Sequence, residues 1–219
     1  VMSVLSFGRG KGWTGGGGGA LLTRSRNAPS IARNGHGRGG DLRAVSLAAA
    51  QWTFGRPSLY GIPAALPWLG LGETRYRDPV PPRQLPRAAA SLLLHGAAAA
   101  EREGEQRKRR AARLLEMVTR RRGIEPIEPL PRGVPGYLRL PLRVNGGLSR
   151  LANREAAVRL GAARSYPQPL GELPAVRARL VSRWQWPGAE ELARDLITLP
   201  THSLLTADDL DRLVRAVTG

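Results

Sequence analysis

The sequence predicts a mixed α/β protein, and two stretches of it lead to this prediction. In residues 137–219 the expected order is strand, helix, extended segment, helix, strand and helix. Such alternation is typical of layered α/β structures, because each sheet face needs helices to cover it. At the start of the chain, an apolar run over residues 1–5 breaks into a glycine-rich loop and continues as an extended segment over residues 20–23.

The opening stretch combines a strand, a tight loop and one lysine. Gly15 to Gly19 allow a sharp reversal of the chain, and Lys11 lies on the loop before them. A lysine held there at the edge of a sheet is well placed to offer its amine to an aldehyde cofactor. A glycine-rich surface hairpin with an incidental lysine is the competing interpretation, and a single loop of this kind does not separate the two.

The middle of the chain is predicted to be mostly helical. Residues 42–52 have helical spacing, with Leu42, Val45 and Leu47 available for packing. A long helical region is expected to begin at Arg87 and to run to residue 122, with Gly104 as the place where it could break. Its charge run, residues 101–122, is interpreted as a solvated helix face.

The C-terminal part is predicted to follow a proline-rich linker over residues 123–136. Pro141 within the first strand indicates an edge or an irregularity, because proline cannot donate a ladder hydrogen bond. Thr206 and Asp209 have the spacing of a capping box before the last helix. The expected elements are a strand (137–144), a helix (148–160) closed by Gly161, an extended segment (166–170), a helix (187–196), a strand (197–200) and the final helix.

Composition narrows the class of protein. A chain of 219 residues can hold one large domain or two small ones. It contains no run of 18 apolar residues, so we expect no membrane span, and its start does not resemble a signal peptide. The chain has no cysteine, which excludes disulfides and thiolate metal sites and is consistent with a cytoplasmic protein. We predict no metal site.

The net charge of +17 raises the question of nucleic-acid binding. Of the 34 basic residues only Lys11 and Lys108 are lysines, and the arginines are scattered along the chain. Aromatic residues are few and do not alternate with arginines, as a stacking platform would require. Nucleic-acid binding therefore rests on charge alone, and an anionic small substrate such as a nucleotide diphosphate suits the charge equally well.

Several segments resemble one enzyme family. The pattern Ser6-Phe7-x-x-x-Lys11, with its glycine-rich turn, resembles the cofactor-lysine segment of the DegT/DnrJ-type sugar aminotransferases, which are fold-type I enzymes that use pyridoxal 5'-phosphate (PLP). Residues 166–170 resemble the family's "YP-x-PL" segment, and residues 199–206 its "LP-x-H-x-x-L-T" segment. Residues 186–193 resemble the stretch between these two. The landmarks occur in the family's order behind the lysine motif.

The resemblance implies specific roles and partners. Lys11 would form a Schiff base with PLP and act in catalysis, and Ser6 would hydrogen-bond the PLP phosphate. The substrates would be an amino donor and a nucleotide-linked keto sugar, and the full-length enzyme would be a homodimer. The implied fold is the C-terminal part of a fold-type I transferase. Residues 1–86 would be a remnant of the large PLP-binding domain, residues 87–136 a connecting helix and linker, and residues 137–219 the small α/β domain.

The sequence also departs from the family pattern. Gly171 stands where the family has a histidine after "YP-x-PL", and no "G-x-N-x-R" segment occurs between residues 40 and 57. Only five residues precede Ser6, and none is acidic, so the aspartate that pairs with the PLP ring nitrogen in the family is missing. We therefore expect an incomplete fragment of an aminotransferase. An inactive relative of the family and a basic nucleic-acid-binding protein remain as alternatives.

Overall fold

The computed structural model describes residues 2–8, 11–24, 39–54, 81, 83–119, 121–181 and 185–219. The chain forms two compact units. The first comprises Val1–Glu73 and Arg77–Arg102, and the second comprises Thr74–Tyr76 and Glu103–Gly219. No helix in the described ranges is long and apolar enough to cross a membrane. Residues 25–38 and 55–80 lie outside the described residues.

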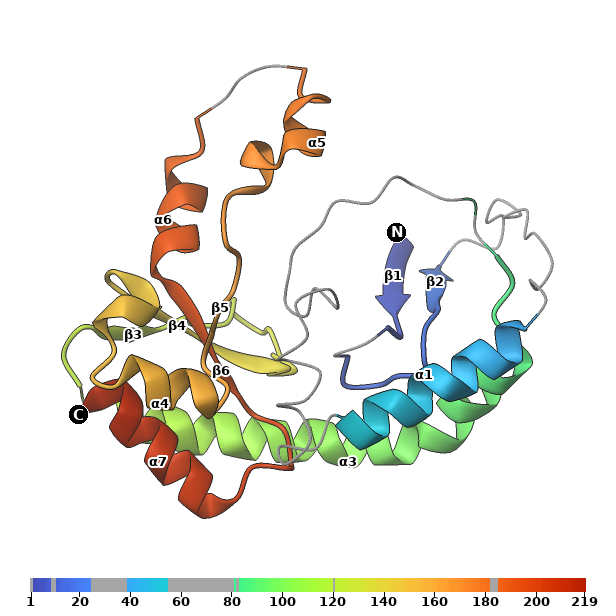
Figure 1. Ribbon diagram of the computed structural model, residues 1–219, viewed down its shortest axis with the longest axis horizontal. Coiled ribbons are helices and arrows are strands. Elements are labelled where there is room, and N and C mark those ends of the chain that lie inside the picture. The colour runs from blue at the N-terminus through green and yellow to red at the C-terminus, as the bar shows by residue number, and fades with distance from the viewer. Residues whose placement is uncertain are drawn as a thin grey trace. The chain divides into compact units, whose positions relative to one another are not determined.

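The first unit opens with a β-hairpin, as predicted. Strand β1 (Met2–Ser6) pairs antiparallel with β2 (Gly19–Thr23), in a register that places Met2 opposite Thr23 and Ser6 opposite Gly19 (Figure 1). All five residues of β1 are exposed, so the hairpin buries neither of its faces within the described residues.

Helix α1 (Gly40–Phe54) confirms the predicted helix, but the residues expected to pack are not the ones that are buried. Leu42 and Val45 are 73% and 50% exposed, whereas Ala44 is buried. The reason is that the glycine-rich loop approaches the backbone of α1 at Ala44, where only a small side chain fits. Asp41 accepts a hydrogen bond from the backbone N–H of Ala88 (2.9 Å), in the first turn of the helix that begins at Arg87.

Helix α3 (Arg87–Val118) is continuous through Gly104, and it ends four residues before the predicted end at residue 122. The division between the two units falls within it, between Arg102 and Glu103. A Cβ added at Gly104 would meet nothing within 4 Å. This glycine therefore has no packing role in the described structure, and an isolated glycine does not by itself break a long helix.

The second unit is built on a four-stranded antiparallel sheet with the order β3-β4-β6-β5. Its strands are β3 (Ile124–Pro126), β4 (Arg139–Val144), β5 (Ala163–Arg164) and β6 (Leu196–Pro200). Strand β3 lies in the stretch predicted to be only a linker, and the prediction missed it because three residues show no alternation. Pro141 lies in an interior strand, but β3 ends opposite Leu142, so only β6 flanks Pro141. Pro141 therefore has a neighbouring strand on one side only, as the prediction of an edge position requires.

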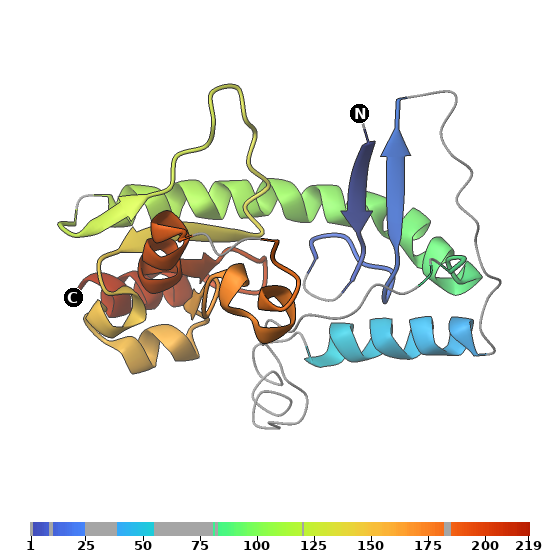
Figure 2. The ribbon, with the colours of Figure 1, turned by 90° about the horizontal axis from the view of Figure 1, so that it is seen from above.

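The core of the second unit lies between this sheet and its helices. Strand β4 alternates, with Leu140, Leu142 and Val144 buried on one face. Helices α3 and α7 (Ala207–Thr218) cover this face, whereas α6 (Pro187–Asp195) lies across the other (Figures 1 and 2). The best-buried members of the core are Ala111, Leu114, Val118, Leu140, Leu142, Ala157, Ile197, Leu199 and Leu213.

The helices of this unit agree with the sequence except in two regions. The single helix expected over residues 148–160 is split into η2 (Gly147–Arg150) and α4 (Arg154–Arg159). The split occurs because the Asn153 side chain accepts the backbone N–H of Ala156 and so starts a new helix. Two short helices, η3 (Leu170–Glu172) and α5 (Pro174–Arg177), were not predicted.

The start of α7 follows the prediction. Thr206 accepts the backbone N–H of Asp209, and the Asp209 carboxylate accepts the backbone N–H of Thr206, which together form a capping box. Hydrogen bonds from both the backbone and the side chain of Thr206 lower the pKa of Asp209. Gly161, which closes α4, has a left-handed φ of 97°, as expected for a helix-ending glycine.

Candidate active site

Lys11 and Ser6 lie on the same hairpin of the first unit. Ser6 is the last residue of β1, and Lys11 follows on the loop that leads to β2. The side chains of both residues are exposed. The backbone N–H of Lys11 donates to Gly8 O (3.3 Å), and Ser6 Oγ lies 3.7 Å from the position that a Cβ on Gly8 would occupy. The strand end and the lysine loop are thus joined by a local turn.

Aromatic side chains hold the base of this loop. The backbone N–H of Phe7 donates to Gly18 O (2.9 Å), which closes the loop at its neck, and the Phe7 ring is buried. The rings of Phe7 and Trp13 meet edge to face with centroids 5.2 Å apart. Trp13 Nε1 donates to Leu93 O on α3 (3.0 Å). The loop is therefore anchored to a helix 80 residues further along the chain.

Thr14 supplies a second anchor. Its Oγ1 lies 2.9 Å from Phe7 O and 3.0 Å from Gln51 Oε1 on α1, and it accepts the backbone N–H of Gly16 (3.2 Å). One hydroxyl thus connects the two ends of the loop with a helix. The sequence did not single out Thr14, because a threonine beside five glycines shows no motif of its own.

Two glycines allow the loop to approach the helices closely. A Cβ on Gly15 would lie 2.7 Å from Ala89 O, and one on Gly16 would lie 2.3 Å from Ala44 O. Gly16 also has a left-handed φ of 81°. Both sites exclude a side chain, so the glycines serve packing as well as turning.

This arrangement offers an amine and a hydroxyl but few acids. In the described part of the first unit the carboxylate side chains are Asp41 and Glu101. The Asp41 carboxylate already accepts the Ala88 N–H, and the described residues contain no cluster of three metal-ligating side chains. The donor set suits an aldehyde cofactor with a phosphate, because an exposed amine can reach a carbonyl and a hydroxyl can donate to phosphate. No partner for a pyridine nitrogen is evident among these residues.

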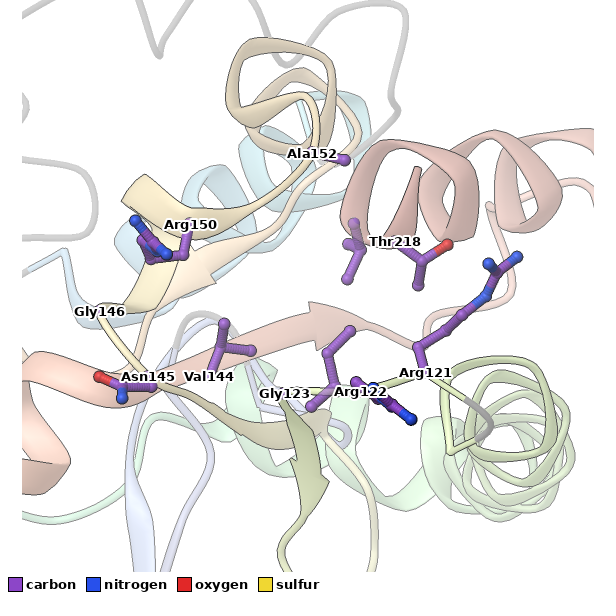
Figure 3. Close-up of a pocket in the computed structure, with 11 residues that line it drawn as sticks. Arg121, Arg122, Gly123, Val144, Asn145, Gly146, Arg150, Ala152 and Thr218 are labelled. Carbon is purple, nitrogen blue, oxygen red and sulfur yellow. The ribbon is translucent and has the colours of Figure 1, made fainter.

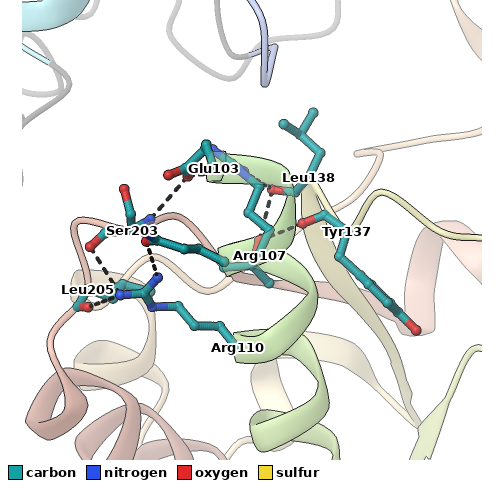
Figure 4. Close-up of polar contacts among 9 residues, drawn as sticks. Glu103, Arg107, Arg110, Tyr137, Leu138, Ser203 and Leu205 are labelled. Carbon is teal, nitrogen blue, oxygen red and sulfur yellow. Dashed lines mark hydrogen bonds and ion pairs between the residues drawn. The ribbon is translucent and has the colours of Figure 1, made fainter. Parts of the chain in front are cut away.

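The "LP-x-H" segment lies in the second unit and has its own polar cluster (Figure 4). Arg107 Nη1 donates to Leu138 O (2.8 Å), and Arg110 Nη2 donates to Ser203 O (3.2 Å) and Leu205 O (3.1 Å). Glu103 accepts the Ser203 N–H (3.1 Å), and its Oε1 lies 2.9 Å from Arg107 Nε, close enough for an ion pair although the N–H points elsewhere.

This cluster corrects the interpretation of the α3 charge run. Glu103, Arg107 and Arg110 recur at helical spacing on one face and are half-buried, not solvated. That spacing was the signal in the sequence, and it was overlooked because long charge runs are commonly exposed. The cluster fixes the loop between β6 and α7.

His202 lies half-buried inside this cluster. Its burial lowers the pKa of the imidazole, and the nearby guanidinium of Arg107 acts in the same direction. Glu103 opposes these effects, while Arg139 and Arg110 add to them. The Nδ1 atom of His202 is buried and has no hydrogen-bond partner within the described residues. A neutral ring is favoured at this position.

Comparison with solved structures gives the fold. DesV from S. venezuelae, in complex with a ketimine intermediate, matches with a TM-score of 0.67 at 19% identity, over 99% of this chain and 50% of that chain. A DegT DnrJ EryC1 StrS aminotransferase from Brucella abortus matches with a TM-score of 0.64 at 22% identity, over the same shares of both chains. At such identities the matches establish the fold alone. The chain spans about half the length of these proteins.

A third structure agrees with the first two. A Streptococcus pneumoniae protein assigned as a sugar aminotransferase, in its PLP form, matches with a TM-score of 0.65 at 18% identity, over 99% of this chain and 50% of that chain. No match was found among curated proteins. The sequence profile of the DegT/DnrJ/EryC1/StrS aminotransferase family matches residues 72–218, well over half of the chain, although Lys11 lies outside this range. The chain therefore belongs to the DegT/DnrJ/EryC1/StrS aminotransferase family.

Proposed function

We propose that this chain is the lysine-bearing part of a PLP-dependent aminotransferase of the sugar-nucleotide type. The observation that carries the proposal is the exposed Lys11 on an anchored loop at the end of β1, on a fold shared with sugar aminotransferases. The substrates proposed are an amino donor and a nucleotide-linked keto sugar. We further propose a homodimer for the full-length enzyme and a cytoplasmic location.

Lys11 and Ser6 have separate roles in this proposal. Lys11 would hold PLP through its Nζ, the amine that can react with an aldehyde. The amine of Lys11 would also move a proton, as general base and then as general acid. Ser6 donates its hydroxyl hydrogen to the phosphate and so keeps the reacting carbon near the lysine. The bound cofactor would supply an electron-withdrawing ring that stabilises negative charge on the adjacent carbon.

We propose that these 219 residues alone form an incomplete site. The support is the shortage of carboxylates in the described part of the first unit and the half coverage of the related structures. In this view residues 1–86 belong to the large PLP-binding domain and residues 137–219 form the small domain. Residues 87–136 form the helix and linker that connect the two. A catalytically inactive relative of the family is the second candidate, and the same shortage of acids favours it.

The two lysines of the chain provide a matched test. The purified chain is incubated with PLP, reduced with borohydride so that hydride adds to the imine carbon, and mapped by mass spectrometry. We expect Lys11 to be labelled in preference to Lys108, which is part-exposed and paired with Glu105 on α3. Labelling at residue 11 should disappear in Lys11→Arg and persist in Lys108→Arg. Equal labelling of the two lysines would contradict the role of Lys11.

A second readout tests whether the site is complete. We expect that adding glutamate or alanine to the PLP-treated chain leaves the cofactor absorbance unchanged, because no described residue holds the pyridine nitrogen. Conversion of the cofactor by the 219-residue chain, abolished in Lys11→Arg, would show that the site is complete. The borohydride labelling experiment and the test with glutamate or alanine can fail independently of each other.

A further inference from the structure

The second unit contains a hollow lined by arginines that the proposed aminotransferase chemistry does not use. It has a volume of about 540 Å³ and is lined by Arg121 and Arg122 after α3, Asn145 after β4, Arg150 on η2, and Thr218 at the end of α7. Figure 3 shows Arg150 on one side of this arginine hollow and Arg121 and Arg122 on the other, with Val144 and Thr218 between them.

The three arginines of the hollow have guanidinium groups that are available to a ligand. Within the described ranges, no hydrogen bond or ion pair engages the guanidinium groups of Arg121, Arg122 or Arg150. Several other arginines of the unit pair with carboxylates and so are less available: Arg107 with Glu103, Arg113 with Asp211, Arg143 with Glu191, Arg159 with Glu155 and Arg194 with Asp195. None of the residues that line the hollow is acidic. Positive charges gathered in a concave site repel one another and attract anions.

The position of Arg150 is fixed by the fold. The buried carboxylate of Asp195 accepts the backbone N–H of Gly146 (3.0 Å), which anchors the turn before η2. A Cβ on Gly146 would lie 2.6 Å from Arg150 Cγ, and Gly146 has a left-handed φ of 82°. The stem of Arg150 therefore lies across a glycine whose conformation and space both exclude a side chain. The backbone N–H groups of Ala152 and Asn153, just after Arg150, donate to carbonyls in the last turn of α7 and hold this segment against that helix.

We propose that the arginine hollow binds a small ligand that carries two or more phosphate groups. Arginine presents a planar fork of donors that matches phosphate oxygens, and guanidinium groups on two sides suit a ligand with charge at more than one point. A volume of about 540 Å³ lies in the range of small-molecule sites. No aromatic residue lines the hollow, so it offers no base stacking, and the phosphate groups are the recognised part.

The test uses the full 219-residue chain and inorganic pyrophosphate, with calorimetric titration at low salt. We expect binding that weakens roughly tenfold or more in Arg150→Ala and in the double variant Arg121→Ala/Arg122→Ala, since each loses charge-assisted hydrogen bonds. Arg177→Ala is the matched control, because it removes one exposed positive charge from α5 in the same unit. It should change affinity less than twofold. Circular dichroism verifies that each variant is folded, and Arg150→Lys, which keeps the charge, should lose only part of the affinity.

Further measurements identify the chemistry of the ligand and the location of its binding site. Amide shifts on adding pyrophosphate should centre on Gly123 and Gly146, which line the hollow. Citrate should bind more weakly than pyrophosphate, and Lys11→Arg should leave pyrophosphate binding unchanged, so this test is independent of the PLP test. Equal losses in Arg150→Ala and Arg177→Ala, shifts centred elsewhere, or tighter binding of a single-stranded oligonucleotide would each overturn the proposal.

Discussion

Replacing Gly16 with alanine should open the lysine loop. The backbone at Gly16 has a left-handed φ of 81°, and an added Cβ would lie 2.3 Å from Ala44 O and 3.3 Å from Ala48 N. Both neighbours are backbone atoms of α1, so no side-chain rotation can relieve the overlap. The loop must move away from the helix, or the helix must shift.

The magnitude follows from two separate costs. Holding alanine in the left-handed region costs about 1–2 kcal/mol. Relieving the overlap in a packed site costs about 1–3 kcal/mol more. The loop should therefore lose roughly 2–5 kcal/mol of local stability, and its amides should exchange at least about thirtyfold faster.

Hydrogen exchange at Phe7 measures this effect, because its amide closes the loop by donating to Gly18 O. Gly104→Ala is the control: nothing lies within 4 Å of its added Cβ, so it should stabilise α3 by about 0.5–1 kcal/mol. Labelling of Lys11 by PLP should fall in Gly16→Ala and not in Gly104→Ala. Unchanged exchange at Phe7 in Gly16→Ala would refute the view that the glycines fix the loop.

Two further predictions concern the second unit. Burial holds the pKa of His202 below its ordinary value of 6.5, so the unfolded chain binds the proton first as the pH falls. The contribution of His202 to the free energy of unfolding should be complete above pH 6.5 and decline as the pH falls below it. Urea unfolding measured above and below pH 6.5 should therefore show a smaller change with pH for His202→Gln than for the unchanged chain. Thr206→Ala should cost about 1 kcal/mol through loss of the cap on α7, whereas Thr206→Ser should cost much less; equal thermal unfolding midpoints for the two variants would contradict the role of the capping box.

The sequence predicted best those elements whose signals are local. Strand β6 and helix α7 were found because an apolar run leads into a capping sequence at Thr206, and both signals act within a few residues. Strand β3 was missed because its three residues become a strand only by pairing with β4, which long-range packing decides. The split of the helix at Asn153 was missed because its amphipathic spacing continues across the break.

The candidate site divides in the same way. The spacing of Ser6 and Lys11 and the glycine run could be recognised in the sequence. The anchors could not, since the contact from Trp13 to Leu93 spans 80 residues and that from Thr14 to Gln51 spans 37. No local pattern encodes such contacts, so the side chains that hold the loop could be identified only in the structure.

These anchors bear on whether the lysine is incidental. A surface hairpin that carries a lysine by chance needs only a turn, and any flexible glycine run can provide one. Here Phe7, Trp13 and Thr14 fix the loop to two helices, and Gly15 and Gly16 allow the close approach, while the Lys11 side chain remains exposed. Ordering a loop in this way costs conformational entropy that a merely connecting hairpin does not require. We propose that these anchors serve to hold the amine of Lys11 in a defined place, and the comparison of Lys11 with Lys108 tests this proposal directly.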